Sequence, residues 1–173
     1  MSDPSQPTWS ADLYRVLRER GTSIVGYVPD SGHRHLIASA HADDGVRAVP
    51  LTTEEEGVGL VAGAHLGHEK AVLLMQSSGV GNCVNFLSLV QHCRFPLLTI
   101  VTMRGEYGEQ NPWQFAMGSA VEPVLHAMHV ATIRADHPDD VQPAAEASVG
   151  MVDRGGQAVA LLLGQRLLGA KKF

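Results

Sequence analysis

The sequence predicts an α/β fold: one domain, residues 1–173, with a doubly wound, mostly parallel six-stranded sheet and helices on both faces. Short apolar runs alternate with longer amphipathic segments from end to end, as in chains built from strand–helix–strand units. The runs are rich in Val, Leu and Ala at consecutive positions, which is typical of parallel strands covered on both faces. A chain of 173 residues suits one domain and can bury a sizeable core.

The first predicted element is a helix with Ser10 as its N-terminal cap and its end at Gly21. Leu13, Val16 and Leu17 recur within it at helical spacing. Six apolar runs bounded by turn residues are predicted strands, at residues 23–28, 46–51, 71–76, 96–103, 130–134 and 157–163. The helices expected between them cover residues 33–42, 54–66, 80–93, 114–128 and 138–152.

Composition restricts the function classes. The net charge of −5 argues against nucleic-acid binding. No apolar stretch reaches membrane-spanning length, and the first nine residues lack the pattern of a signal peptide, so we expect a cytoplasmic protein that does not bind membranes. Cys83 and Cys93 lie in apolar segments and are expected to be reduced, buried thiols. The histidines have no metal-ligand spacing, so no metal site is predicted in this chain.

Four unusual loops follow predicted strands, at residues 29–32, 52–56, 76–82 and 104–112. In open parallel sheets, ligands bind at the carboxyl ends of the strands. The sequence therefore predicts a binding site where these four loops meet.

The second loop opens a helix with three carboxylates. Thr53 and Glu56 have the spacing of a capping box, and Glu54 and Glu55 would favour the positive end of the helix. The functional alternative is a carboxylate directed at a ligand, and both can hold together. The same helix carries three glycines, each costing about 1 kcal/mol relative to alanine, which indicates that something approaches closely.

The third loop is rich in neutral hydrogen-bonding groups. Its Gly79-Val80-Gly81 segment is a weak phosphate-binding signal, and a tight strand-to-helix turn explains it equally well. The first and fourth loops offer Asp30, His33 and Arg104 as candidate substrate-side residues. Arg104 is placed to bind an anion or to pair with a nearby glutamate, Glu106 or Glu109.

Four segments carry a family resemblance: VPDS at 28–31, EEEGVGLVAGAHL at 54–66, MQSSGVGNCVN at 75–85 and RGEYG at 104–108. With the order of elements they cover nearly the whole chain. The chain resembles the pyrimidine-binding domain of thiamine diphosphate-dependent 2-oxo acid decarboxylases, in particular the sulfopyruvate decarboxylase alpha subunits and the matching half of the phosphonopyruvate decarboxylases.

The resemblance implies a chemistry for the acidic turn. Glu54, or Glu55 if the match slips by one position, would hydrogen-bond the cofactor's aminopyrimidine and activate it for decarboxylation. Such a carboxylate should be desolvated. Residues implied to line the cofactor are Gln76, Ser77, Ser78, Gly79 and Asn82.

The resemblance also implies a partner. Full-length members carry a second domain, with a GDG motif and a later Asn, that holds Mg2+ and the diphosphate, and this sequence has no such motif. We therefore expect a hetero-oligomer with a beta subunit, acting on a small anionic 2-oxo acid. Sulfopyruvate, giving sulfoacetaldehyde and CO2, is the first choice, and phosphonopyruvate is the second. A carboligase, and a non-catalytic nucleotide-binding or assembly domain of the same fold, remain alternatives.

Overall fold

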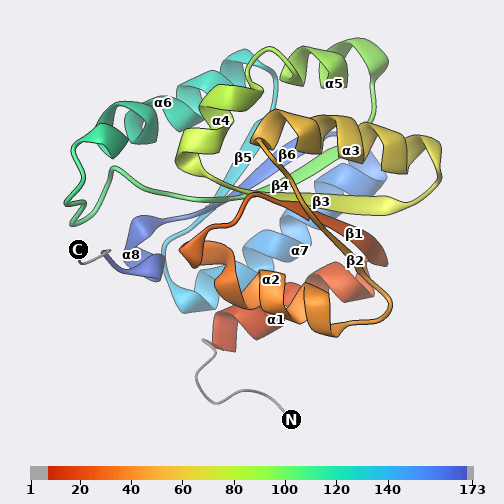
Figure 1. Ribbon diagram of the computed structural model, residues 1–173, viewed down its shortest axis with the longest axis horizontal. Helices are drawn as coiled ribbons and strands as arrows, with labels where there is room; N and C mark the ends of the chain where they lie inside the picture. Colours follow the sequence, from red (N-terminus) through yellow and green to blue (C-terminus); the bar gives the residue numbers. More distant parts are fainter. Residues whose placement is uncertain (1–7, 171–173) are drawn as a thin grey trace.

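A computed structural model describes residues 8–170 of the chain as a six-stranded sheet with the order β2-β1-β3-β4-β6-β5 (Figure 1). Every pair of neighbouring strands is parallel, which confirms the predicted α/β class. The strands are β1 Thr22–Tyr27, β2 Arg47–Pro50, β3 Lys70–Gln76, β4 Leu97–Thr102, β5 Ala131–Ala135 and β6 Ala158–Leu163.

Helices cover both faces of the sheet (Figure 1). One layer consists of α1 Thr8–Glu19, α2 Arg34–Ala42 and α7 Pro138–Gly155. The other consists of α3 Glu54–Leu66, α4 Ser77–Cys83, α5 Leu87–Cys93 and α6 Trp113–Ala127. A 3-10 turn, η1 Ser31–His33, precedes α2, and a short α8, Gln165–Leu168, follows β6.

The central strands explain the two cores. Successive side chains of a strand point to opposite faces, so Val72 and Leu74 of β3 pack toward the α1, α2 and α7 layer. Leu73 and Met75 pack toward the α3–α6 layer. All four side chains are at most 3% exposed, as the consecutive apolar residues predicted.

Three element boundaries were predicted wrongly. Ser10 does not precede the first helix, because α1 has already begun at Thr8. The helix predicted to begin at residue 80 begins at Ser77, so most of the predicted loop at 76–82 is helical. The predicted helix over 80–93 is also two helices, with a turn at residues 84–86. In that turn the Ser88 and Leu89 N–H groups donate to carbonyls three residues back, and the Ser88 hydroxyl donates to the carbonyl of Asn85. These local bonds compete with the regular helical pattern.

No helix in the described part of the chain is long and apolar enough to cross a membrane. The N-terminal segment on which the signal-peptide prediction rests lies mostly outside the described residues.

Candidate cofactor site

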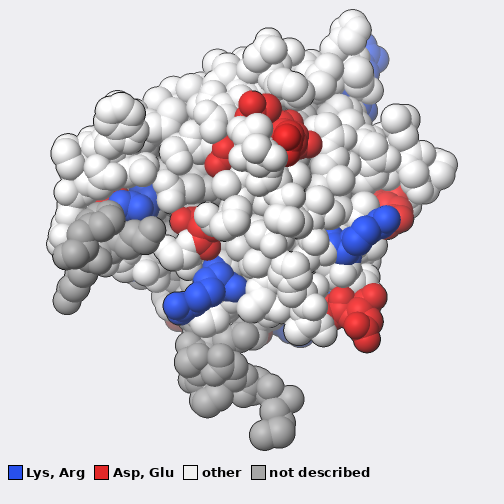
Figure 2. All heavy atoms as spheres, viewed as in Figure 1, with Lys and Arg blue, Asp and Glu red and all other residues white. Residues whose placement is uncertain are grey.

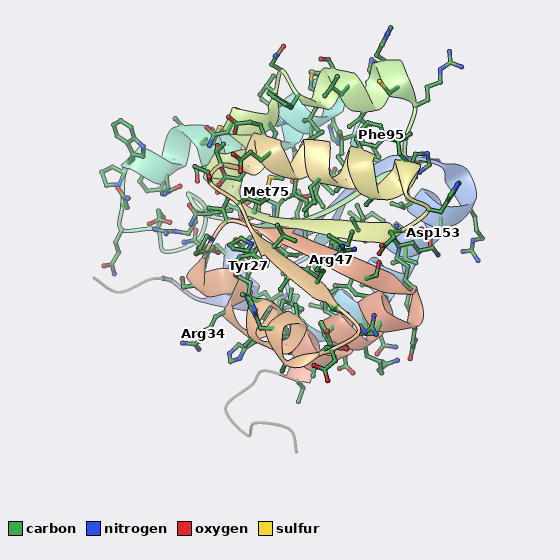
Figure 3. The ribbon with its side chains drawn as sticks, turned by 45° about the vertical axis from the view of Figure 1, so that its right-hand side comes forward. Tyr27, Arg34, Arg47, Met75, Phe95 and Asp153 are labelled. Atoms are coloured by element: carbon green, nitrogen blue, oxygen red, sulfur yellow. The ribbon has the colours of Figure 1, made fainter. Side chains whose placement is uncertain are left out.

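The carboxyl ends of β1, β3 and β4 and the start of α3 bring the four predicted loops together. Asp30 of the first loop accepts a hydrogen bond from Gln76 at the end of β3 (3.0 Å). Glu54 of the second loop accepts one from Asn82 of α4 (2.8 Å). The Arg104 N–H donates to the Ser77 hydroxyl (3.1 Å) and so joins the fourth loop to the third. Figure 3 shows Met75 near this edge of the sheet and Asp153 at the opposite end.

Glu54 is the first residue of α3 and is only 8% exposed. Its Oε2 atom accepts the hydrogen bond from the Asn82 amide. A carboxylate in this position also benefits from the positive end of the helix dipole. The structure thus holds a buried carboxylate in place at the rim of the sheet, as expected for a desolvated carboxylate at the start of this helix.

Gly79 of α4 forms the wall opposite Glu54. A Cβ atom at position 79 would lie 2.5 Å from the Glu54 Cδ atom and 2.6 Å from Oε1. Any larger residue would therefore displace the carboxylate. In this fold Gly79 makes room for Glu54. The sequence offered only a weak phosphate-binding signal for this glycine and did not indicate that role.

The other two glutamates of the turn have local partners. Glu55 is half-buried and accepts a hydrogen bond from the Thr53 hydroxyl, which lowers the pKa of Glu55. Glu56 is exposed and accepts the Thr52 N–H (2.9 Å). The predicted capping box between Thr53 and Glu56 is therefore wrong, because each side chain bonds to a different group. Of the three carboxylates, Glu54 is the one that faces α4.

Asp30 anchors a polar cluster beside this turn. It accepts hydrogen bonds from Gln76, from the Thr102 hydroxyl (2.8 Å) and from the Gly32 N–H (3.0 Å). Ser78 in turn donates to the Gln76 side chain (3.1 Å). Burial raises the pKa of Asp30, but the bonds from Thr102 and Gln76 and the nearby imidazole outweigh burial, and the pKa is lowered. The cluster therefore presents an ionised carboxylate with fixed donors. Sequence reasoning missed Thr102, although a hydroxyl at the end of an apolar strand was the available signal.

His33 and Arg104 are committed to the protein itself. The His33 ring is fully buried, its Nε2 atom lies 3.0 Å from the Met75 carbonyl oxygen, and burial lowers its pKa. Arg104 donates through Nε (2.5 Å) and Nη2 (2.6 Å) to both carboxylate oxygens of Glu109, whose side chain is 0% exposed. Arg104 was predicted either to bind an anion or to pair with Glu106 or Glu109. In the structure it pairs with Glu109, and Glu106 pairs with Arg134.

Cys83 lies in the core beneath Glu54, and burial together with the charges of Glu54 and Glu55 raises the pKa of its thiol to about 12. It is a neutral packing residue at physiological pH. Cys93 is exposed, so the predicted burial of this second thiol is wrong. Among residues 8–170 no group of three or more His, Cys, Asp or Glu side chains could hold a metal ion.

Solved structures share the fold of this chain. No model of a protein family matches the sequence. A protein from Mycobacterium smegmatis classed as a thiamin diphosphate-dependent enzyme superposes with a TM-score of 0.70 at 16% identity, over 94% of this chain and 31% of its own. The chain thus has the fold of the pyrimidine-binding domain of thiamine diphosphate-dependent enzymes.

Curated relatives identify the family. The sulfopyruvate decarboxylase subunit alpha of Methanococcus maripaludis is 32% identical over 147 residues, covering 82% of this chain and 88% of the relative. That of Methanothermobacter thermautotrophicus is 33% identical over 155 residues, covering 89% and 94%. The phosphonopyruvate decarboxylase of Streptomyces viridochromogenes is 37% identical over 111 residues, covering 63% of this chain but 28% of the relative. The chain belongs to the family of sulfopyruvate decarboxylase alpha subunits.

Proposed function

We propose that this chain is the alpha subunit of a thiamine diphosphate-dependent decarboxylase that converts sulfopyruvate to sulfoacetaldehyde and CO2. The observation that carries the proposal is the buried Glu54 carboxylate, which Asn82 holds and for which Gly79 leaves space. A fixed, desolvated carboxylate is the group that this chemistry needs beside the pyrimidine ring of the cofactor.

The residues of the site fit the pyrimidine end of the cofactor. When bound, thiamine diphosphate supplies the carbanion and the electron sink for loss of CO2. Glu54 would form a hydrogen bond with a ring nitrogen, and Asn82 would keep the Glu54 carboxylate in one orientation. Gln76 and Ser78 offer neutral donors and acceptors at the same rim. Glu55, which is bonded within its own turn, is the weaker candidate for the activating group.

We further propose that a beta subunit holds Mg2+ and the diphosphate. The relatives named subunit alpha match this chain over most of their length. A single-chain sulfopyruvate decarboxylase from Methanosarcina acetivorans matches it over only 29% of its own length. The rest of the catalytic machinery would therefore come from a second polypeptide, and we place the assembled enzyme in the cytoplasm.

The substrate side rests on the Asp30 cluster, with a small cavity of about 140 Å3 beside it that also touches Thr102 and Arg104. We propose that Asp30, His33 and Arg104 shape the substrate side through the groups they hold, because all three are already bonded to protein groups. The match to a phosphonopyruvate decarboxylase keeps phosphonopyruvate as the second candidate.

The test is reconstitution. The chain is mixed with the polypeptide from the same genome that matches the remaining part of the single-chain relatives, with thiamine diphosphate and Mg2+, and CO2 release from sulfopyruvate is measured. We expect Glu54→Gln to abolish activity and the matched control Glu55→Gln to retain it. Full activity in both variants would contradict the mechanism. Ligand binding by the isolated chain without thiamine dependence would favour the non-catalytic alternative, and product analysis would detect a carboligase.

A further inference from the structure

Three helices on one side of the sheet, α4, α5 and α6, carry almost no charge. Each helix of the α1, α2 and α7 layer carries charged residues, as a solvated face does. By contrast, α4 and α5 contain no Asp, Glu, Lys or Arg, and the whole segment from 71 to 93 lacks them. In α6 the only such residue is Glu122. Depletion of charge distinguishes the core of a protein interface from ordinary surface.

The same part of the molecule, α4, α5 and α6, also exposes large apolar side chains. Trp113 is 86% exposed, Phe115 46% and Leu89 40%. Two more, Val84 and Phe86, lie in the turn between α4 and α5, at 36% and 38%. Figure 2 shows few charged atoms over the upper helices, apart from an acidic cluster at the start of α3 and a basic group at the margin. Aromatic residues at an exposed, uncharged face are typical of binding surfaces.

We propose that this surface, the outer side of α4, α5 and α6 with these five side chains, binds the partner subunit. The proposal rests on the proposed function and names where the two chains meet. The surface is continuous with the cofactor site, because α4 supplies both Gly79 and Asn82 to the Glu54 carboxylate. Since α4 packs against α6, a partner seated on both helices would lie beside Asn82, which holds the Glu54 carboxylate.

The curated relatives indicate which polypeptide binds this surface. In the single-chain relatives the segment matched by this chain is about 30% of the polypeptide, so the remainder stays beside it through a covalent link. The subunit alpha relatives lack that link, and surface contacts must replace it. An uncharged apolar face selects a partner face of the same character, because burying an unpaired charge against it would be costly. The partner is therefore the polypeptide that corresponds to the remainder.

The test introduces a charge on this surface and measures binding to the purified partner. Leu89→Asp and Phe86→Asp each place a carboxylate on the proposed interface at a partly exposed position. The matched control is Ala147→Asp, an exposed position on α7 in the charged layer. Affinity is measured by calorimetry, and thermal unfolding of each isolated variant shows that the fold is retained. We expect each surface variant to lose about tenfold or more in affinity and the control to bind like wild type.

The outcomes separate this inference from the proposed function. Wild-type affinity in folded Leu89→Asp and Phe86→Asp would overturn the assigned surface, while Glu54-dependent decarboxylation would still stand. A complex that forms normally with Glu54→Gln but is inactive, together with weakened partner binding by Leu89→Asp and Phe86→Asp, would support both. Wild-type chains that self-associate, and that become monomers in the two surface variants without a change in partner binding, would assign the surface to a second copy and overturn the occupant proposed here.

Discussion

If Gly79 is needed to make room for the Glu54 carboxylate, substitutions at positions 54 and 79 should be energetically coupled. The Cβ of Gly79→Ala would lie 2.5 Å from the Cδ atom of Glu54. Either the two helices separate, or Glu54 turns away and loses its hydrogen bond from Asn82. Overpacking of this kind costs about 1–3 kcal/mol, and a hydrogen bond to a charged group is worth about 1.5–3 kcal/mol. The helical preference for alanine returns at most about 1 kcal/mol.

The sign of the Gly79→Ala effect should therefore depend on residue 54. In the wild-type background we expect destabilisation by up to about 2 kcal/mol, which is the cost of overpacking less the propensity gain. In a Glu54→Ala background the obstruction is absent, and the same change should stabilise by about 0.5–1 kcal/mol. The four proteins of this cycle are compared by urea unfolding followed by circular dichroism. A coupling of about 1–3 kcal/mol is expected.

The control for this cycle is Gly63→Ala in α3, where an added Cβ would meet no atom within 4 Å. It should stabilise by about 0.5–1 kcal/mol in both backgrounds, with no coupling to residue 54. In the reconstituted enzyme, Gly79→Ala should lose activity as Glu54→Gln does, and Gly63→Ala should not. A coupling below about 0.5 kcal/mol between positions 54 and 79 would refute the argument that Gly79 shapes the site.

Two further predictions concern the scaffold. Gly57→Ala would place a Cβ 2.9 Å from Leu73 Cδ2, so it should destabilise the chain by about 1–3 kcal/mol in urea unfolding, and a stabilised variant would contradict the packing. The Arg104 ion pair holds the pKa of Glu109 well below its usual range. Its stabilisation is full above the unfolded pKa of about 4.3 and is lost as pH falls toward the folded pKa. Glu109→Gln should therefore cost about 3 kcal/mol at pH 7 and less at pH 3, and a pH-independent difference in unfolding midpoint would argue against the pair.

The fold was largely predictable because its main signals are local. The apolar run at 71–76 is a buried central strand, as expected from residues covered on both faces. Helix breaks were not predictable in the same way. The apolar spacing from Val80 to Cys93 continues across both α4 and α5, and only the hydroxyl of Ser88 and the three-residue bonds of the turn divide them. Periodicity carries no information on such local competition.

The meeting of the four loops was predictable, but the pairings between their side chains were not. Loops after parallel strands share one edge of the sheet, which is why Asp30, Gln76 and Arg104 were grouped correctly in space. Which glutamate pairs with Arg104 was left open, because Glu106 and Glu109 are both close in sequence. The structure selects Glu109 through backbone donors as well as the guanidinium. Such choices depend on the path of a loop that is set by tertiary contacts, including the bond from Gln165.

The proposed enzyme would divide its work between two chains. Everything that fixes Glu54 lies within this polypeptide: the helix start that carries it, the amide of Asn82 and the space at Gly79. The carboxylate is therefore set in orientation before a partner arrives, and assembly does not have to pay for ordering it. Anchoring of the phosphates is what the partner would add. Such a division predicts that substitutions at Glu54 lower turnover and leave the affinity between the subunits unchanged. Substitutions on the α4–α6 surface should lower that affinity, while turnover measured at a saturating concentration of the partner stays unchanged.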